Sequence, residues 1–212
     1  MSVDELIAGL AANGVELWVE GDRLRFRSPR GALAAAQREQ IAARRDAVMA
    51  RLRARAAQGE RRAPLSFSQR SLWFLHQQAP DSTAYHVAFA ARVRSAVVRP
   101  ALRHALQALV DRHPVLRTVY AFDDAAPVQR VLGDAAVAFE QRAVAGLGDA
   151  ALRAEVEAEY ARPFDLEQGP VFRATLFTRA DDDHVLLLNV HHIAADGWSL
   201  LLLVEELRQL YA

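Results

Sequence analysis

A short apolar run that ends in two adjacent histidines is the feature that most constrains how this chain folds. Residues 184–190 are almost unbroken in apolar side chains, which is typical of a buried strand. A leucine-rich stretch follows from Ser199, a residue type that commonly caps a helix. The sequence therefore predicts a strand, a loop and a helix, and it places the segment NVHHIAADGWS, residues 189–199, in the loop, where function is often found.

The paired histidines of this loop cannot both address one substrate. Neighbouring residues on an extended backbone point to opposite faces, so we expect either His191 or His192 to face inward. An imidazole accepts a proton from a nucleophile or holds the nucleophile by a hydrogen bond. Asp196 can orient that ring or pair with an arginine, and Gly197 permits a turn that no side chain tolerates.

Three simpler interpretations compete with a catalytic one. A metal site is disfavoured because the two histidine side chains diverge and no other histidine or cysteine lies close in the sequence. A buried histidine satisfied by hydrogen bonds suits His191 better than His192. The pair Asp196-Gly197 alone is ordinary turn chemistry.

The segment HHIAADGWS resembles the HHxxxDG core motif of the condensation domains of nonribosomal peptide synthetases, and three more segments agree in the same order. Residues 65–75, LSFSQRSLWFL, resemble the first core motif of that family, and residues 112–120, RHPVLRTVY, resemble the second. Residues 163–170, PFDLEQGP, are similar to the segment that usually precedes the histidines. HHxxxDG alone is shared with chloramphenicol acetyltransferase and related acyltransferases. Many first motifs carry arginine where this chain has Ser71, with Arg70 one place earlier, so no role is transferred to either residue.

This resemblance implies a fold class and a reaction. The fold is a mixture of α+β and α/β: residues 64–212 form the N-terminal lobe of a two-lobed fold like that of chloramphenicol acetyltransferase. The reaction joins an acyl or peptidyl donor to an aminoacyl acceptor, both held on phosphopantetheine arms of upstream and downstream carrier proteins, and the chain itself binds no cofactor or metal. The resemblance implies that His192 contacts the attacking amine, that Asp196 holds the loop through an ion pair, and that Gly197 brings the backbone close to the reacting groups. With His191 they complete the motif, and we expect the fragment alone to be inactive.

The other matched segments favour structural roles. Phe67, Leu72, Trp73 and Leu75 are candidates for the core because large apolar side chains at helical spacing usually pack. The sequence predicts a helix over Pro100 to Asp111 and a strand over Val115 to Phe122. His113 and Arg117, between the two, either line a substrate tunnel or tie down the turn.

The first sixty residues have a different pattern. Ser2 and Glu5 form a capping box, and apolar residues recur at helical spacing until Asn13-Gly14 ends the helix. Alternating segments on either side of Gly21-Asp22 predict a β-hairpin, and helical sequence resumes at about Ala32. The apolar residues of the first helix are Val3, Leu6, Ile7 and Leu10.

This helix, hairpin and helix resemble the N-terminal docking domain of the tubulysin-synthetase type, residues 1–60. The resemblance implies a partner, the C-terminal peptide of an upstream synthase, bound by adding a strand to the hairpin. Arg23, Arg25 and Arg27 share one strand face and could meet an acidic peptide, and Trp18, on the face opposite Leu17 and Val19, is a candidate anchor. A solvated strand face is the alternative, and a homodimer through this domain stays open.

Charge separates the two parts of the chain. Up to Arg62 there are 12 arginines and 8 acidic residues, or +4, and the remainder has 14 and 18, or −4. Residues 37–62 are rich in Ala and Arg, which raises the alternative of a nucleic-acid helix. The stripe of Ile41, Val48 and Leu52 favours a packed helix instead, with no nucleic acid bound, joined to the next domain by about Ala57 to Ala63.

Composition excludes further classes. The chain has no cysteine, so disulfides, thiol catalysis and cysteine-based metal sites are excluded. No apolar stretch reaches the length of a membrane span, and residues 1–10 lack the features of a signal peptide. We expect a cytoplasmic protein that does not bind membranes.

Two other functions remain as alternatives. The chain could be an interaction module only, or a stand-alone acyltransferase that uses a soluble acyl-CoA donor, although such an enzyme needs no docking domain. An epimerization domain shares HHxxxDG but normally follows a carrier protein, and a heterocyclizing relative has aspartate in place of the histidine pair.

Overall fold

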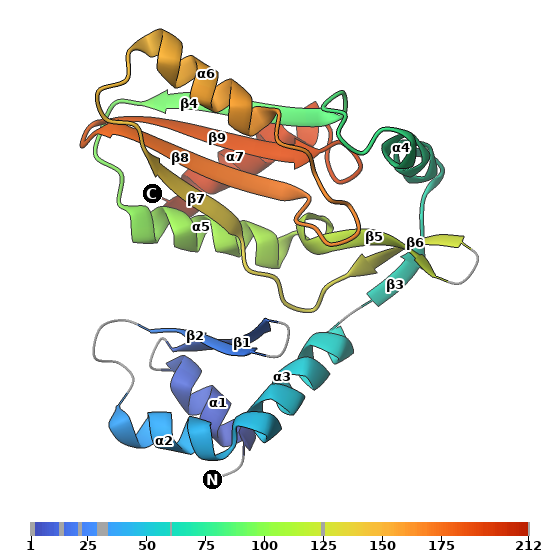
Figure 1. Ribbon diagram of the computed structural model, residues 1–212, viewed down its shortest axis with the longest axis vertical. Helices are drawn as coiled ribbons and strands as arrows, with labels where there is room; N and C mark the ends of the chain where they lie inside the picture. The colour runs from blue at the N-terminus through green and yellow to red at the C-terminus, as the bar shows by residue number, and fades with distance from the viewer. Residues whose placement is uncertain are drawn as a thin grey trace. The chain divides into compact units, whose positions relative to one another are not determined.

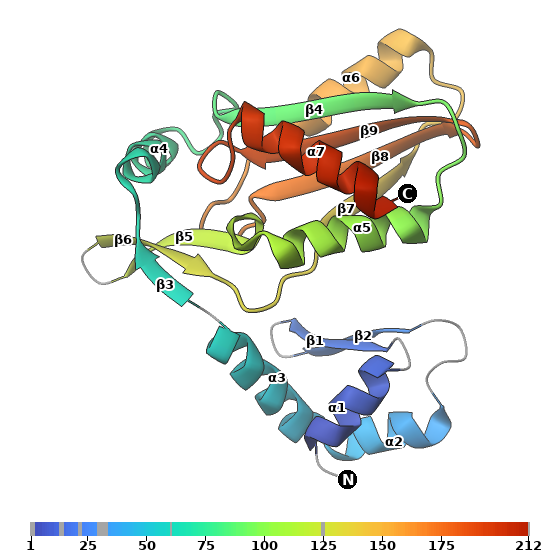
Figure 2. The same ribbon diagram turned by 180° about the vertical axis from the view of Figure 1, so that it is seen from behind.

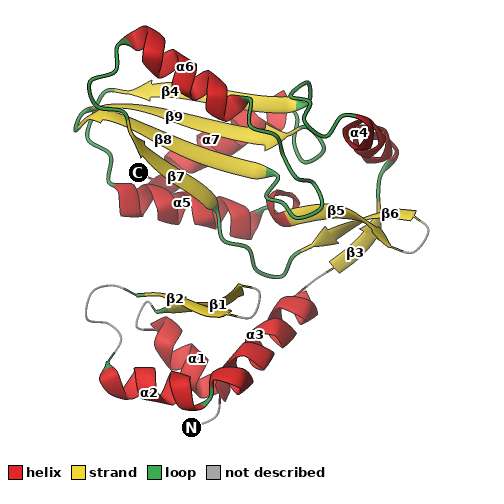
Figure 3. Cartoon of the chain, viewed as in Figure 1, coloured by secondary structure: helices red, strands yellow, loops and turns green. Residues whose placement is uncertain are grey.

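The computed structural model describes residues 3–12, 15–20, 23–28, 34–59, 61–123 and 126–211. The chain divides into two compact units, Met1–Glu60 and Arg61–Ala212, which are described separately (Figures 1 and 3). Ser2, Asn13-Gly14, Gly21-Asp22 and Ala32, to which the sequence assigned a cap, a helix end, a turn and a helix start, lie outside the described residues.

The first unit consists of three helices and a hairpin. Its elements are α1 (Val3–Ala12), β1 (Glu16–Glu20), β2 (Arg23–Arg27), α2 (Ala35–Ala43) and α3 (Arg45–Gly59). The strands pair antiparallel, as the alternating sequence predicts. The predicted stripe of α1 is confirmed: Leu6, Ile7 and Leu10 are buried together with Val15 and Val48 in one core.

The basic segment after the hairpin differs from the prediction in two ways. It forms two helices instead of one, because the backbone leaves helical geometry at Arg44, with φ of −121° and ψ of 20°. The stripe still packs: Val48 is fully buried, and Ile41 and Leu52 lie against the same core. The boundary between the two units, after Glu60, falls inside the predicted linker of about Ala57 to Ala63. The residues on either side nevertheless belong to regular elements, since α3 continues to Gly59 and β3 (Arg61–Pro64) pairs with a strand of the second unit.

A four-stranded sheet with helices on both faces forms the centre of the second unit. The strand order is β4 (His86–Val93), β9 (Asp183–His191), β8 (Phe172–Ala180) and β7 (Ala138–Ala143), and only β7 and β8 are parallel. Helix α6 (Asp149–Tyr160) covers one face, while α5 (Arg99–Arg112) and α7 (Gly197–Tyr211) cover the other (Figures 1 and 2). Side chains alternate along β9, so the strand contributes to a hydrophobic core on each face of the sheet. Leu188 and Val190 pack with α5 and α7, and Leu187 packs with α6.

A smaller sheet and one helix lie beyond the end of α5 (Figure 2). The sheet has the order β3, β6 (Ala126–Val131) and β5 (Thr118–Asp123), and the helix is α4 (Phe67–Gln78). The predicted strand starts at Thr118 instead of Val115, because Pro114–Arg117 forms a 3-10 turn.

The core prediction for α4 is only partly right. Trp73 is 3% exposed and Leu72 packs beside it, but Phe67 is 88% exposed and Leu75 is 41% exposed. Ser66 caps the helix through the backbone N–H of Gln69, which makes Phe67 the first helical residue. A helix that buries a single narrow face leaves both of these side chains outside.

Candidate active site

The two histidines diverge at the end of the central strand β9. His191 is the last residue of the strand and is 2% exposed, whereas His192 is exposed in the loop that follows. The backbone N–H of His191 donates to Val171 O, and that of His192 donates to Tyr85 O, at 2.9 and 2.8 Å. The expected divergence of the side chains is confirmed, and neighbouring segments hold the loop through its backbone.

Hydrogen bonding determines the protonation of His191. Its Nδ1 accepts from the backbone N–H of Ile193 at 3.1 Å, so Nδ1 carries no proton. Burial, reinforced by the positive charges that His76, His86 and His192 carry when protonated, lowers the pKa of His191 to about 3. His191 is therefore a neutral ring with its proton on Nε2.

Asp196 acts as the cap of α7, a role that the sequence favoured for Ser199. Its Oδ1 accepts from the backbone N–H and the Oγ of Ser199, both at 2.7 Å, and these bonds lower the pKa of Asp196. Leu200 N–H donates to the Asp196 carbonyl, which starts the helix. Among the described residues Asp196 forms no ion pair, so the expected one stays a prediction.

Gly197 also differs from the expectation. An added Cβ would meet no atom within 4 Å, and its φ is not among the positive values found at Gly146 and Gly169. The turn would therefore tolerate a side chain. In this chain the glycine keeps space open at the start of α7 instead of allowing a strained backbone.

Aromatic rings surround the buried face of the site. The ring of His191 lies 5.9 Å from those of His76 and Phe164 and 6.4 Å from those of Tyr85 and His86, measured between centroids. No sequence pattern pointed to His76, Tyr85 or His86. The sequence assigned no role to Phe164, which lies in the segment that begins at Pro163. In the structure its ring packs against those of both His86 and His191.

A buried ion cluster supports Phe164 from behind. The Arg173 guanidinium lies 3.9 Å from the Phe164 ring centroid, and its Nη1 donates to Pro163 O at 2.7 Å. Burial, with the nearby charge of Arg162, lowers the pKa of Arg173 to about 10. Glu159, 2% exposed, pairs with Arg142 and Arg162 at 2.5 and 2.9 Å. Sequence patterns did not reveal this cluster: Glu159 and Arg162 are only three residues apart, but Arg142 and Arg173 join them from the neighbouring strands β7 and β8.

The second matched motif ties elements together. His113 Nε2 lies 2.5 Å from Glu206 Oε2, which joins α5 to α7. Arg117 donates to the carbonyls of Leu132 and Val110. Of the two roles left open for His113 and Arg117, fastening the turn is the one that these contacts support.

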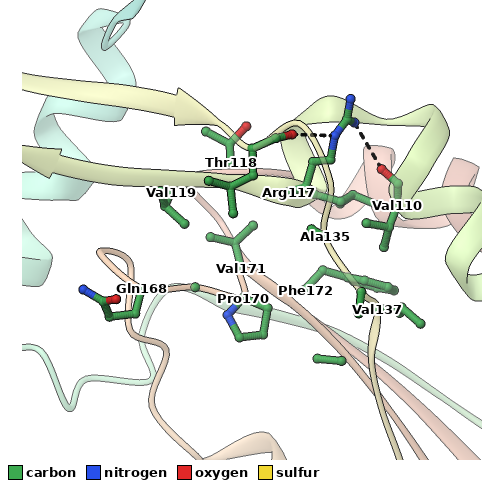
Figure 4. Close-up of a pocket in the computed structure, with 15 residues that line it drawn as sticks. Val110, Arg117, Thr118, Val119, Ala135, Val137, Gln168, Pro170, Val171 and Phe172 are labelled. Carbon is green, nitrogen blue, oxygen red and sulfur yellow. Dashed lines mark hydrogen bonds between the residues drawn. The ribbon is translucent and has the colours of Figure 1, made fainter. Parts of the chain in front are cut away.

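A cavity of about 240 Å³ lies beside this turn (Figure 4). Arg117, Thr118, Gln168 and the apolar side chains of Val171 and Phe172 line it. None of the residues 191–197 borders the cavity, so it is separate from the histidine loop. In the first motif, Ser71 Oγ donates to Phe67 O within its own helix, and both Arg70 and Ser71 are exposed.

The four residues suggested for docking share one face of the hairpin. Trp18 pairs with Arg25, Glu20 pairs with Arg23, and residues paired across strands point to the same side. The Arg27 Cζ lies 5.9 Å from the Trp18 ring centroid. Arg25 Nε lies 2.7 Å from Glu20 Oε2, so a glutamate that no sequence pattern singled out partly neutralises this face.

Two features of the described residues bear on metals and membranes. These residues contain no group of three or more histidine, cysteine or acidic residues that could hold a metal ion. Within the same described ranges, none of the helices has both the length and the apolar character that a membrane span requires.

The buried histidine predicts a pH-dependent stability. Because the pKa of His191 falls from 6.5 to about 3 on folding, the unfolded chain binds more protons between these values. The free energy of unfolding should therefore fall as the pH falls through this window, by about 2 kcal/mol between pH 7 and pH 5. The lowered pKa values of His76 and His86 act in the same direction.

Urea unfolding at the two pH values measures this loss. His191→Asn, whose amide oxygen can still accept from Ile193 N–H, is the matched control and should lose less stability on acidification. Equal losses in both proteins would mean that His191 is not the group responsible.

Comparisons with known proteins agree with this geometry. The family model for the condensation domain matches residues 59–212, and that for the TubC N-terminal docking domain matches residues 3–54. The chain is 41% identical over 150 residues to malpibaldin synthetase of Mortierella alpina, covering 69% of this chain and 3% of that protein. It is 41% identical over 152 residues to a phosphinothricin tripeptide synthetase of Streptomyces viridochromogenes, covering 69% and 14%.

A solved structure shows the same fold. A mutant of the starter condensation domain of rhizomide synthetase, in complex with C8-CoA, matches with a TM-score of 0.65 and 27% identity, covering 71% of this chain and 35% of that one. The chain therefore spans a small part of these relatives. With a condensation-domain match over residues 59–212 and a docking-domain match before it, this chain belongs to the condensation domain family of nonribosomal peptide synthetases and carries a TubC-type N-terminal docking domain.

Proposed function

We propose that this chain is the docking and histidine-motif portion of a synthetase that forms an amide bond between two carrier-bound substrates. The donor is an acyl or peptidyl thioester, the acceptor is an aminoacyl thioester, and phosphopantetheine arms of upstream and downstream carrier proteins deliver both. The chain binds no cofactor of its own. The observation that carries the proposal is the exposure of His192 beside a buried, neutral His191.

The chemistry requires little more than positioning. The lone pair of the acceptor amine attacks the thioester carbon, and the C–S bond breaks so that the sulfur leaves as the thiolate of the donor's phosphopantetheine arm. The nitrogen loses one proton, which ends on that sulfur and gives the free thiol. An exposed imidazole at His192 can accept that proton or hold the amine in line. His191 supports the loop from inside, and Asp196 fixes the start of α7 by capping it. Alignment of the two tethered substrates supplies much of the acceleration.

The remaining part of a condensation domain is proposed to cover one face of α7. Trp198, Leu201 and Leu202 are 72%, 54% and 57% exposed, and they follow directly after the histidine loop. Residues spaced by three and four share a helix face, so they form one apolar patch. A two-lobed domain, of which residues 64–212 form the first lobe, would bury this patch and complete the substrate channel. The 212-residue chain alone is accordingly proposed to be inactive.

The docking unit, residues 1–60, is proposed to capture the C-terminal peptide of an upstream synthase. Within the described residues β2 pairs only with β1, and β1 is the strand that contacts α1 and α3. An added strand on β2 would gain backbone hydrogen bonds there. The three arginines Arg23, Arg25 and Arg27 outnumber the two glutamates at paired positions of the hairpin, Glu16 and Glu20. Trp18 offers an apolar contact on the same face.

Calorimetric titration tests the docking role. C-terminal peptides of the synthases encoded beside this chain should bind saturably, and more weakly as salt rises. Replacing Arg23, Arg25 and Arg27 together by glutamine should weaken binding by about tenfold, because each exposed charge contributes roughly 0.5 kcal/mol. The matched control changes three exposed arginines of the second unit, Arg94, Arg99 and Arg153, and should leave binding unaltered.

The outcomes separate the proposals. Binding to no peptide would remove the docking role and leave the condensation role untouched. Binding that does not depend on salt would contradict the role of the three arginines but would still support docking by this domain.

An acyl-CoA donor is the second candidate, because a relative of this chain was solved with C8-CoA. Supplying the donor either as a CoA thioester or on a carrier protein discriminates the two in a protein with the complete domain. If neither donor supports turnover and the peptide still binds, the chain would be an interaction module only.

A further inference from the structure

His86 lies next to His191 in the sheet, yet its chemistry has no part in the proposed reaction. It is the first residue of β4 and the cross-strand partner of His191 in the β4–β9 ladder. Its side chain is buried at 7% exposure, and its ring centroid lies 6.4 Å from that of His191. Two buried imidazoles therefore sit side by side directly behind the exposed His192.

The protonation of His86 follows from its surroundings. Its Nδ1 lies 2.8 Å from the carbonyl oxygen of Tyr160, which can only accept, so Nδ1 carries the proton. Burial lowers the pKa of His86 and keeps the ring neutral. Its Nε2 is thus an acceptor, and it is buried without a hydrogen-bond partner among the described residues. Such an orphan acceptor costs stability unless a donor reaches it.

His191 offers the complementary group. Because Ile193 N–H occupies its Nδ1, its only ring proton is on Nε2, and no described residue accepts that proton. The two rings that carry this donor and this acceptor are cross-strand partners. With the centroids 6.4 Å apart, the two nitrogens cannot reach the ~3 Å of a direct hydrogen bond, but one water molecule spans such a gap.

We propose that His86 is a positioning residue for the histidine loop, and that it holds the His191 ring through one buried water between the two Nε2 atoms. The backbone connects this ring to the reacting side chain: His191 O accepts from Ala194 N–H, and His192 N–H donates to Tyr85 O, next to His86 in the chain. A fixed His191 ring thus fixes the direction in which His192 leaves the strand. This inference rests on the proposed function of the loop.

Histidine-ring NMR tests the inference without any measurement of catalysis, so its failure is distinguishable from failure of the proposed function. In the ¹⁵N-histidine-labelled chain, we expect the His191 proton on Nε2, exchanging slowly with solvent. In His86→Asn, the side-chain amide can still donate to Tyr160 O but cannot reach the water. The His191 ring proton should then exchange at least about fivefold faster.

Two further variants make the result specific. His86→Gln places an oxygen acceptor near the position of Nε2 and should restore slow exchange. His184→Asn is the matched control: His184 is also buried on β9, but both its ring nitrogens are partnered, by Thr178 Oγ1 and Asp181 O. It should leave the His191 proton unchanged.

The wild-type protein alone can also overturn the proposal, so a variant that does not fold does not prevent the test. A proton on Nδ1 of His191, or rapid exchange of the Nε2 proton in the wild type, contradicts it. Exchange that is unchanged in a folded His86→Asn contradicts it as well.

Discussion

Replacing His192 with alanine should lower the rate of condensation by about 10² to 10⁴, the range that a single proton-transferring side chain contributes. His192 is exposed and leaves the strand opposite the buried His191, so the substitution removes the reacting group without opening the core. The measurement is single-turnover amide formation by a protein that carries the complete domain, with both substrates on carrier proteins. The 212-residue chain should show no turnover under the same conditions.

The controls for this experiment separate chemistry from folding and docking. His104, an exposed histidine on α5, provides the matched variant His104→Ala, which should keep the wild-type rate. Peptide binding by the docking unit should be the same in His192→Ala as in the wild type. A near-normal condensation rate in His192→Ala would remove His192 from its role.

Replacing Phe164 with alanine should reduce the free energy of unfolding by about 3–5 kcal/mol, because a buried aromatic ring is lost and a cavity remains. Phe164 is 3% exposed and lies between the Arg173 guanidinium and the rings of His86 and His191, at 3.9, 4.8 and 5.9 Å. Urea unfolding gives the change. The variant should also broaden the ring signals of His191, since the wall beside that ring is gone.

Phe74 is the matched control for Phe164. It is 61% exposed on α4, so Phe74→Ala should alter stability by no more than about 0.5 kcal/mol. Similar losses in the two variants would show that Phe164 is not part of a tightly packed core.

Local patterns predicted several elements correctly. The apolar run before the histidines became β9, and the apolar spacing of the first helix became the core of the docking unit. The divergence of His191 and His192 followed from the geometry of an extended chain alone. Each of these features depends on residues close together in the sequence, for which periodicity is a sufficient guide.

The predictions of helix caps, core residues and strand ends were wrong where more than one local arrangement suited the same residues. Ser199 is a suitable cap, but Asp196 lies three residues earlier and accepts from the Ser199 backbone and hydroxyl, so the helix begins at Gly197. Phe67 and Leu75 fit an apolar stripe, but among the described residues α4 packs against the core on the side of Trp73 and leaves these two side chains exposed. Pro114 shortened a predicted strand by forming a turn.

The sequence by itself determined that the apolar run before the histidines is a buried strand and that the first helix packs by its apolar stripe. It also determined that the two histidines of the loop face opposite ways. It also favoured His191 as the buried one, which the structure confirms, but only the tertiary structure decided that His86, His76 and Phe164 surround it. The tertiary structure also decided that Glu159 pairs with three arginines next to Phe164. The physical reason is distance along the chain: His86 and His191 are brought together by strand pairing across more than a hundred residues, and no local period records that register.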